Sequence, residues 1–78
     1  MVNISRVDNI AFESTHFYDD KKFNNYIVWL EGDDAPYRMT KCMNIINAKR
    51  DIPKNGDHIS YTLDGYRLKN VNILYNVE

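Results

Sequence analysis

Apolar and polar residues alternate most clearly near the C-terminal end of the chain, over residues 58–64. In HISYTLD the side chains of Ile59, Tyr61 and Leu63 point to one side and the remaining side chains to the other. This is the period of two that is typical of a half-buried strand. Asp64-Gly65 follows, and this dipeptide tolerates the positive φ angles of a type I′ turn. The pattern therefore predicts a β-hairpin that turns at Asp64-Gly65.

The second strand of this hairpin changes phase partway along. One extra residue near Lys69-Asn70 would bring all of its apolar positions to the same side, as a β-bulge does while it bends the strand. Small barrels need such a bend where a strand leaves one partner for another. The alternative is that the two apolar sets face different layers. The positions before and after the phase change are Tyr66 and Leu68, then Val71, Ile73 and Tyr75.

A second apolar segment, YIVWLE at residues 26–31, is rich in β-branched and aromatic residues and predicts a central strand. Both of its sides are apolar, so it is either covered on both or carries a binding surface. Residues 9–18 are expected to pair with it across the polar segment 19–25. A turn at 31–36 and a short strand at 37–40 complete this half of the chain. The two sides of the central strand carry Tyr26, Val28 and Leu30, and Ile27 and Trp29.

The segment MTKCMNIINAK, residues 39–49, predicts one short helix. Its apolar residues recur at the i, i+3, i+4 and i+7 spacing of a helix face. Thr40 is a suitable N-cap, and Pro53 disfavours continuation of the helix. A cysteine on this face would be buried. The face consists of Met39, Cys42, Met43 and Ile46.

The resulting order, three strands, a short helix and two more strands, predicts a mainly β fold: a small five-stranded curled sheet or barrel of OB-like layout. The tail NGDHISYTLDGYRLKNVNI also resembles, in shape, the closing strands of cold-shock and OB-type barrels. It lacks the aromatic RNA-binding strand patterns of cold-shock proteins. An SH3-like barrel and an α+β sheet are the alternatives.

The chain has 78 residues, which predicts a single small β-rich domain spanning residues 1–78 with a modest core. Cys42 is the only cysteine, and no long apolar run is present, so we expect a cytoplasmic protein without disulfides. The abundance of Asn, Ile, Lys and Tyr indicates an AT-rich source genome, as in many phages and low-GC bacteria.

The candidate chemistry argues against an enzyme. His16 and His58 lack the spacing of zinc ligands, and the pairs Asp19-Asp20 and Asp33-Asp34 are expected to be solvated loop carboxylates. Each of the 3 glycines stands in an expected turn, which leaves no phosphate-binding loop. We therefore expect neither catalytic residues nor a metal or other cofactor.

Binding of single-stranded nucleic acid is the favoured function. The net charge is −1, but residues 38–78 hold seven basic and four acidic side chains, so a local basic patch is available. Aromatic rings interleaved with cations hold single strands, because rings stack on bases while Lys and Arg neutralise phosphates. The predicted site residues are Trp29, Tyr37 and Tyr66 for stacking, and Arg38, Lys41, Arg67 and Lys69 for charge neutralisation.

Protein binding is the alternative function, because Tyr, Trp and Arg are also enriched in the hot spots of protein interfaces. A compact interaction or inhibitor module, such as a phage or mobile-element product that binds a host protein, would use an overlapping surface. Unpaired strand edges would in addition support a homodimer. No membrane association is expected.

Overall fold

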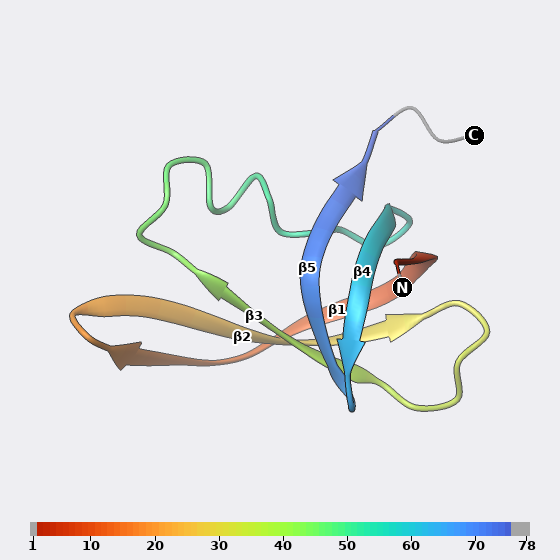
Figure 1. The fold of residues 1–78 in the computed structure, drawn as a ribbon, viewed down its shortest axis with the longest axis horizontal. Helices are drawn as coiled ribbons and strands as arrows, with labels where there is room; N and C mark the ends of the chain where they lie inside the picture. Colours follow the sequence, from red (N-terminus) through yellow and green to blue (C-terminus); the bar gives the residue numbers. More distant parts are fainter. Residues whose placement is uncertain (1, 76–78) are drawn as a thin grey trace.

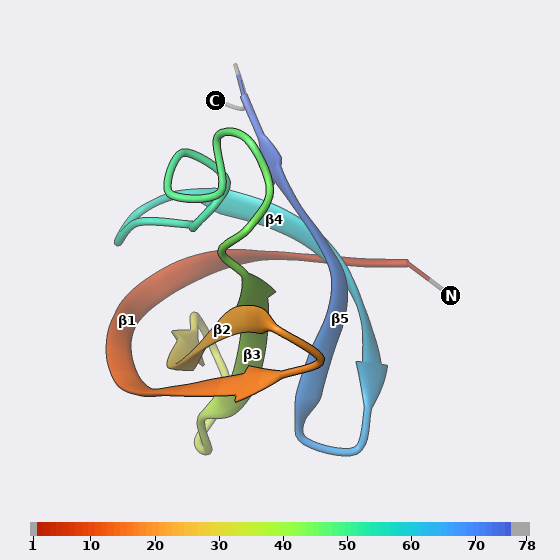
Figure 2. The ribbon, with the colours of Figure 1, turned by 90° about the vertical axis from the view of Figure 1, so that its left-hand side faces the viewer.

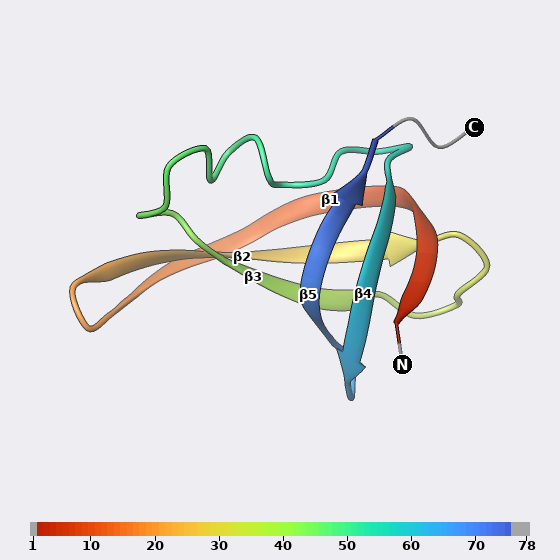
Figure 3. The same ribbon diagram turned by 45° about the horizontal axis from the view of Figure 1, so that its top comes forward.

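The computed structural model describes residues 2–75, which form a five-stranded β-sheet closed into a ring (Figure 1). The order around the ring is β1-β2-β3-β5-β4, and all neighbours are antiparallel except β3 and β5. The β4–β5 hairpin crosses the layer formed by the other three strands (Figure 3). The strands are β1 (Asn3–Tyr18), β2 (Lys21–Leu30), β3 (Tyr37–Cys42), β4 (His58–Asp64) and β5 (Arg67–Leu74).

The long first strand closes the ring. Its first part, Asn3 to Arg6, pairs with β4, and from Val7 onward it pairs with β2. A register shift between Val7 and Asn9 marks the change of partner, and the strand is strongly curved (Figure 2). Bulges commonly provide such bends in small barrels. The sequence pattern predicted only residues 9–18 of this strand, and the part that closes the ring was missed.

The predicted division of β2 into two sides is confirmed. Tyr26, Val28 and Leu30 are buried, whereas Ile27 and Trp29 are half-buried on the outer side. The buried side joins a single apolar core inside the ring, since inward-facing residues alternate along each strand. The other buried apolar members of this core are Val7, Met39, Ile59, Tyr61 and Leu68.

The predicted bulge in β5 is present. Ser60 pairs with Asn72 and Thr62 with Lys69, so Tyr61 stands opposite the two residues Asn70 and Val71. Asn70 has φ 53°, the left-handed conformation of the first residue in a G1-type bulge. The extra residue restores the phase of three of the five apolar positions, because Leu68, Val71 and Ile73 pack on or against the core. Tyr66, in the turn, and Tyr75, after the end of β5, were expected on the same side but are 71% and 67% exposed.

The turn of this hairpin lies one residue later than predicted. Asp64 pairs with Arg67, so the two-residue loop is Gly65-Tyr66. Only Gly65 of this pair has a positive φ, 62°, which fits a type II′ turn better than type I′. Leu63, expected inside, is 45% exposed because it stands one residue pair away from the turn, at the end of the hairpin.

The β1–β2 hairpin turns more tightly than predicted. Its loop is Asp19-Asp20 alone, with φ values of 52° and 60°, and the pairing continues down to Tyr18 opposite Lys21. Two positive φ angles define a type I′ turn. The tight turn makes the far ends of β1 and β2 an arm that projects past β4 and β5 (Figures 1 and 3).

The predicted short helix is wrong. Residues 37–42 form β3, which pairs with β2 from Val28↔Tyr37 to Phe23↔Cys42, and residues 43–52 form successive turns. Pairing with β2 overrides the local helical spacing, and the left-handed Asn47 (φ 67°) interrupts the segment that follows. Met39 therefore reaches the core through strand alternation, and Cys42 is half-buried. None of residues 2–75 forms a helix able to span a lipid bilayer.

Candidate functional site

Four of the predicted site residues meet where β3 and β5 touch. The two strands pair at Arg38↔Arg67, and the Arg38 backbone N–H donates to the Tyr66 carbonyl at 2.8 Å. The rings of Tyr37 and Tyr66 lie 6.4 Å apart between centroids, tilted by 43°. Because Tyr66 occupies the exposed turn, its side chain is 71% accessible. We call Tyr37, Arg38, Tyr66 and Arg67 the seam cluster.

An acidic loop flanks the Tyr37 side of the seam cluster. The Asp33 carboxylate raises the pKa of the Tyr37 hydroxyl above its ordinary value, chiefly by hydrogen bonding, with desolvation and the carboxylate's charge adding to the effect. Each factor disfavours the phenolate. Tyr37 is neutral at physiological pH with or without this shift, and its half-buried ring packs against the core.

Beyond the seam cluster β3 and β5 diverge (Figure 1). A groove of about 490 Å³ is lined by residues of both strands. Lys41 and Lys69 line it together with Arg67, so three of the predicted cations share one hollow. Asp51 is its acidic lining residue, and five of its lining residues are apolar. A groove of this kind combines positive charge with surface on which flat groups can lie. The apolar lining residues are Met39, Cys42, Ile45, Leu68 and Val71.

Acidic neighbours partly compensate these cations. Arg38 contacts Glu13 at 2.9 Å and Lys69 contacts Asp64 at 3.1 Å, while Lys41 lies 3.8 Å from Asp51. Arg67 takes part in none of the ion pairs among residues 2–75. Exposed pairs of this kind hold side chains weakly, with about 0–1 kcal/mol each, so an anionic ligand can compete for these cations.

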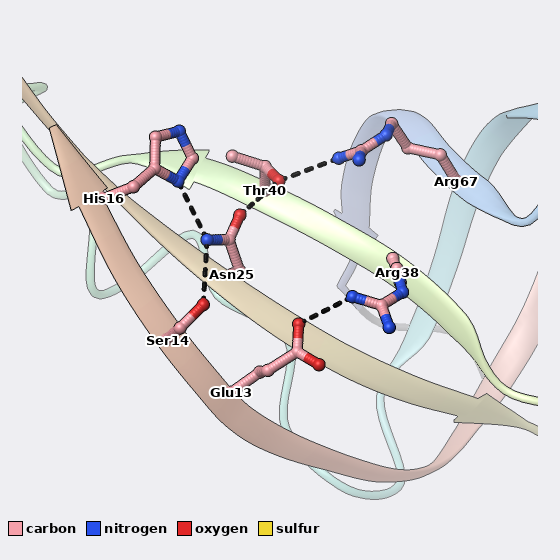
Figure 4. A network of polar contacts seen from close by, with 7 residues as sticks. All are labelled: Glu13, Ser14, His16, Asn25, Arg38, Thr40 and Arg67. Atoms are coloured by element: carbon pink, nitrogen blue, oxygen red, sulfur yellow. Dashed lines mark hydrogen bonds and ion pairs between the residues drawn. The ribbon is translucent and has the colours of Figure 1, made fainter. Parts of the chain in front are cut away.

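Arg67 is instead held by a chain of hydrogen bonds across the sheet (Figure 4). Its guanidinium donates to the Thr40 hydroxyl at 2.9 Å, and that hydroxyl donates to the side-chain Oδ1 of Asn25 at 2.8 Å. The Asn25 amide lies 3.2 Å from the Ser14 hydroxyl and 2.9 Å from His16 Nδ1. The chain fixes the Arg67 guanidinium over the outer side of β3, next to Arg38.

The outer side of β2 extends this surface. Phe23, Asn25, Ile27 and Trp29 occupy alternate positions there, all half-buried, and Ile27 pairs with Arg38 of the seam cluster. Trp29 follows Ile27 by two residues, which is roughly 7 Å along the strand at about 3.3 Å per residue. Trp29 is therefore on the same outer surface as the arginines but outside the seam cluster.

Several polar and aromatic residues on this surface were not predicted from the sequence. Phe23 stacks on His16 with 5.2 Å between ring centroids and 11° between planes. Had the alternation in residues 26–31 been extended back to Lys21, both Phe23 and Asn25 would have appeared on the outer side. Thr40 was instead assigned as a helix cap. Ser14 and His16 pair with β2 beyond a bulge that changes the side-chain parity of β1, so simple alternation along the sequence could not place them on the outer side.

Among the residues that the structure describes, no three His, Cys, Asp or Glu side chains gather as a metal site would require. The chain matches no protein-family model, and no curated protein or solved structure is significantly similar to it.

Proposed function

We propose that this protein is an OB-like barrel that binds single-stranded nucleic acid. The OB-like assignment is supported by the ring order, by β1 contacting both β2 and β4, and by the parallel contact of β3 with β5. OB-folds bind oligonucleotides on the face of strands 2 and 3 and with the adjoining loops. The corresponding surface here is the outer side of β2 and β3 with the β4–β5 turn.

The observation that carries the proposal is the seam cluster. It places two arginines on adjacent strands near two neighbouring rings: Tyr66 is largely exposed, whereas Tyr37 is half-buried and packs against the core from the side of β3 opposite to Arg38. A base stacks on Tyr66 or Tyr37, while Arg38 and Arg67 contact the phosphates on either side. Arg67 is already oriented by Thr40, so little side-chain entropy is lost when it meets a phosphate.

Two further features of the surface would extend the path of the bound nucleic acid. The groove with Lys41 and Lys69 continues from the seam cluster along β5, and Trp29 offers a third ring on the outer side of β2. Stacking contributes about 1–3 kcal/mol per base, so two or three rings would contribute about 2–9 kcal/mol. Micromolar binding corresponds to about 8 kcal/mol and therefore also requires the phosphate contacts. Acidic residues near the site limit the affinity, because phosphates must displace them from the cations.

Titration of fluorescently labelled single-stranded DNA and RNA at about 50 mM and about 200 mM salt tests the proposal. Neutralisation of three or four phosphates predicts a slope of about −0.7 per phosphate, which corresponds to a loss of affinity of about 20- to 50-fold over this range. Absence of binding at the lower salt concentration would refute the proposal.

Variants locate the site. Tyr66→Ala and Arg67→Gln are expected to lower affinity about 5- to 100-fold without lowering the melting temperature, because both side chains are exposed. Tyr75→Ala and Arg50→Gln are matched controls, exposed but outside the seam cluster, and should bind like wild type. Equal losses in controls and site variants would show that the seam cluster is not the binding surface.

A second candidate function, a protein-interaction or inhibitor module, is favoured by one observation. The β1–β2 arm exposes Phe17 and Tyr18 beside its acidic turn, and neither residue lines the groove between β3 and β5. Retention of partner binding by Tyr66→Ala together with its loss in Tyr18→Ala would identify the arm, rather than the seam cluster, as the functional surface.

A further inference from the structure

The outer edge of the β1–β2 arm is an unused pairing surface. Strand β1 pairs with β4 only up to Arg6, while its other side pairs with β2 as far as Tyr18. The backbone of Val7 still bonds to the loop before β4, and the Ile10 N–H donates to Asn55 at 3.0 Å. From Ala11 to Tyr18 this edge has no second strand among residues 2–75.

This edge carries few of the features that usually prevent strands from pairing between molecules. Proteins protect edges with Lys, Pro or inward-pointing charges. The segment AFESTHFY, residues 11–18, has neither Lys, Arg nor Pro, and its one charge, Glu13, is held by Arg38 at 2.9 Å. The edge of β3 that faces the groove, in contrast, is flanked by Lys41, Arg67 and Lys69. Only the β1 side of the arm therefore presents a largely uncharged edge.

The arm edge also exposes apolar rings on one face. Phe12 pairs with Tyr26, and Phe17 pairs with Lys22 four residues earlier on β2, so both phenylalanines share one face of the sheet. The bulge between Phe12 and Ser14 makes this possible, since the two residues have opposite parity in the sequence. They are 59% and 73% exposed.

We infer that this edge pairs with the same edge of a second copy of the chain. Antiparallel β1–β1 pairing about a two-fold axis perpendicular to the sheet extends the arm into a continuous sheet and is self-complementary. It satisfies the unpaired backbone groups of Ala11–Tyr18 and brings the Phe12 and Phe17 rings of both copies onto one face. The net charge of −1 gives little repulsion between copies.

The length of the edge sets the strength of this dimer. Eight residues span about 27 Å, and the contact is smaller than a standard interface, so we expect a dimer that forms at micromolar rather than nanomolar concentrations. The two outer faces of β2 and β3 would then lie on the same side of one sheet. This last consequence, a doubled platform for a longer single strand, rests on the proposed function, whereas dimerisation itself does not.

Sedimentation equilibrium without nucleic acid tests the dimer directly. Wild-type protein is expected to pass from monomer to dimer between about 1 µM and about 500 µM, a range chosen for a weak interface. Phe17→Lys adds a protecting charge to the edge and should weaken dimerisation at least about 10-fold. Ile46→Lys is the matched control: its side chain is 85% exposed in the loop after β3, and dimerisation should be unchanged.

Hydrogen exchange identifies the surface. Amides of residues 11–18 are expected to gain protection as the wild-type concentration rises, with no such gain in Phe17→Lys. Both variants should retain the wild-type melting temperature, because neither side chain is in the core. A monomer at every concentration, a dimer that Phe17→Lys leaves intact, or a dimer without protection of residues 11–18 would each overturn the inference.

Discussion

The β5 bulge gives the sharpest test of the fold, because one backbone angle decides the result. Asn70 has φ 53°, a conformation that costs a residue with a Cβ about 1–2 kcal/mol and that Asn and Gly adopt most readily. Its side-chain amide also donates to the Thr62 hydroxyl at 3.1 Å. We consider Asn70→Ala and Asn70→Gly, which both remove this hydrogen bond.

Alanine retains the full conformational cost and loses the exposed hydrogen bond, so Asn70→Ala should lower the free energy of unfolding by about 1–2 kcal/mol. Glycine removes the conformational cost but adds freedom to the unfolded chain, so Asn70→Gly should lie within about 1 kcal/mol of wild type. The glycine variant is therefore expected to be the more stable of the two by about 1 kcal/mol. At an ordinary strand position the order is reversed, because glycine there is less stable than alanine by about 0.5–1 kcal/mol.

Urea denaturation measures the difference directly. For a chain of this size an m-value near 1 kcal/mol/M converts the expected difference into a shift of the midpoint by about 1 M. Asn72, also on β5 but without a positive φ, provides the control: Asn72→Gly should be less stable than Asn72→Ala. If alanine were the better residue at position 70 as well, the bulge and the curvature ascribed to it would be wrong.

Four further outcomes are expected. Trp29→Ala should weaken binding of single-stranded DNA about 5- to 100-fold in an anisotropy titration, and unchanged affinity would remove β2 from the binding surface. The raised pKa of Tyr37 means that its contribution to stability is complete below the ordinary value near 10 and is lost as the pH rises beyond it. Melting temperatures measured from about pH 9 to about pH 11 should therefore fall more for wild type than for Tyr37→Phe; parallel curves would contradict the Asp33 contact. Replacing Asp19→Asn and Asp20→Gly together should raise the free energy of unfolding by about 0.5–1 kcal/mol, because both φ angles are positive and the paired charges are removed; a less stable product would argue against the type I′ turn. Ile59→Ala, at a side chain with 0% exposure, should cost about 2–5 kcal/mol in urea denaturation, and a loss under about 1 kcal/mol would place it outside the core.

Short-range patterns were enough to predict that both hairpins exist and how β2 divides into two sides, although they misplaced both turns. The alternation in residues 58–64, the phase change near Asn70 and the burial of Tyr26, Val28 and Leu30 depend on side-chain parity within one strand and its neighbour. Parity is fixed by the extended backbone itself, so it can be read before any tertiary contact is known.

Tertiary pairing decided what local patterns left ambiguous. Residues 39–42 carry a helical spacing of apolar side chains, yet they form part of β3. They do so because their backbone pairs with β2 and because Met39 is buried in the core of the barrel. The closure of the ring pairs Asn3 with Tyr61, across most of the chain, and no short window of sequence contains both.

The proximity of the candidate-site residues was also decided by tertiary strand pairing. The sequence identified Tyr37, Arg38, Tyr66 and Arg67 as residue types suited to a single strand, in two segments almost thirty positions apart. Only the parallel contact of β3 with β5 brings the two segments together, and that contact exists because the barrel closes. The sequence thus determined the chemical groups and their local faces, while their proximity was decided by long-range strand pairing, whose energy depends on partners that are distant along the chain.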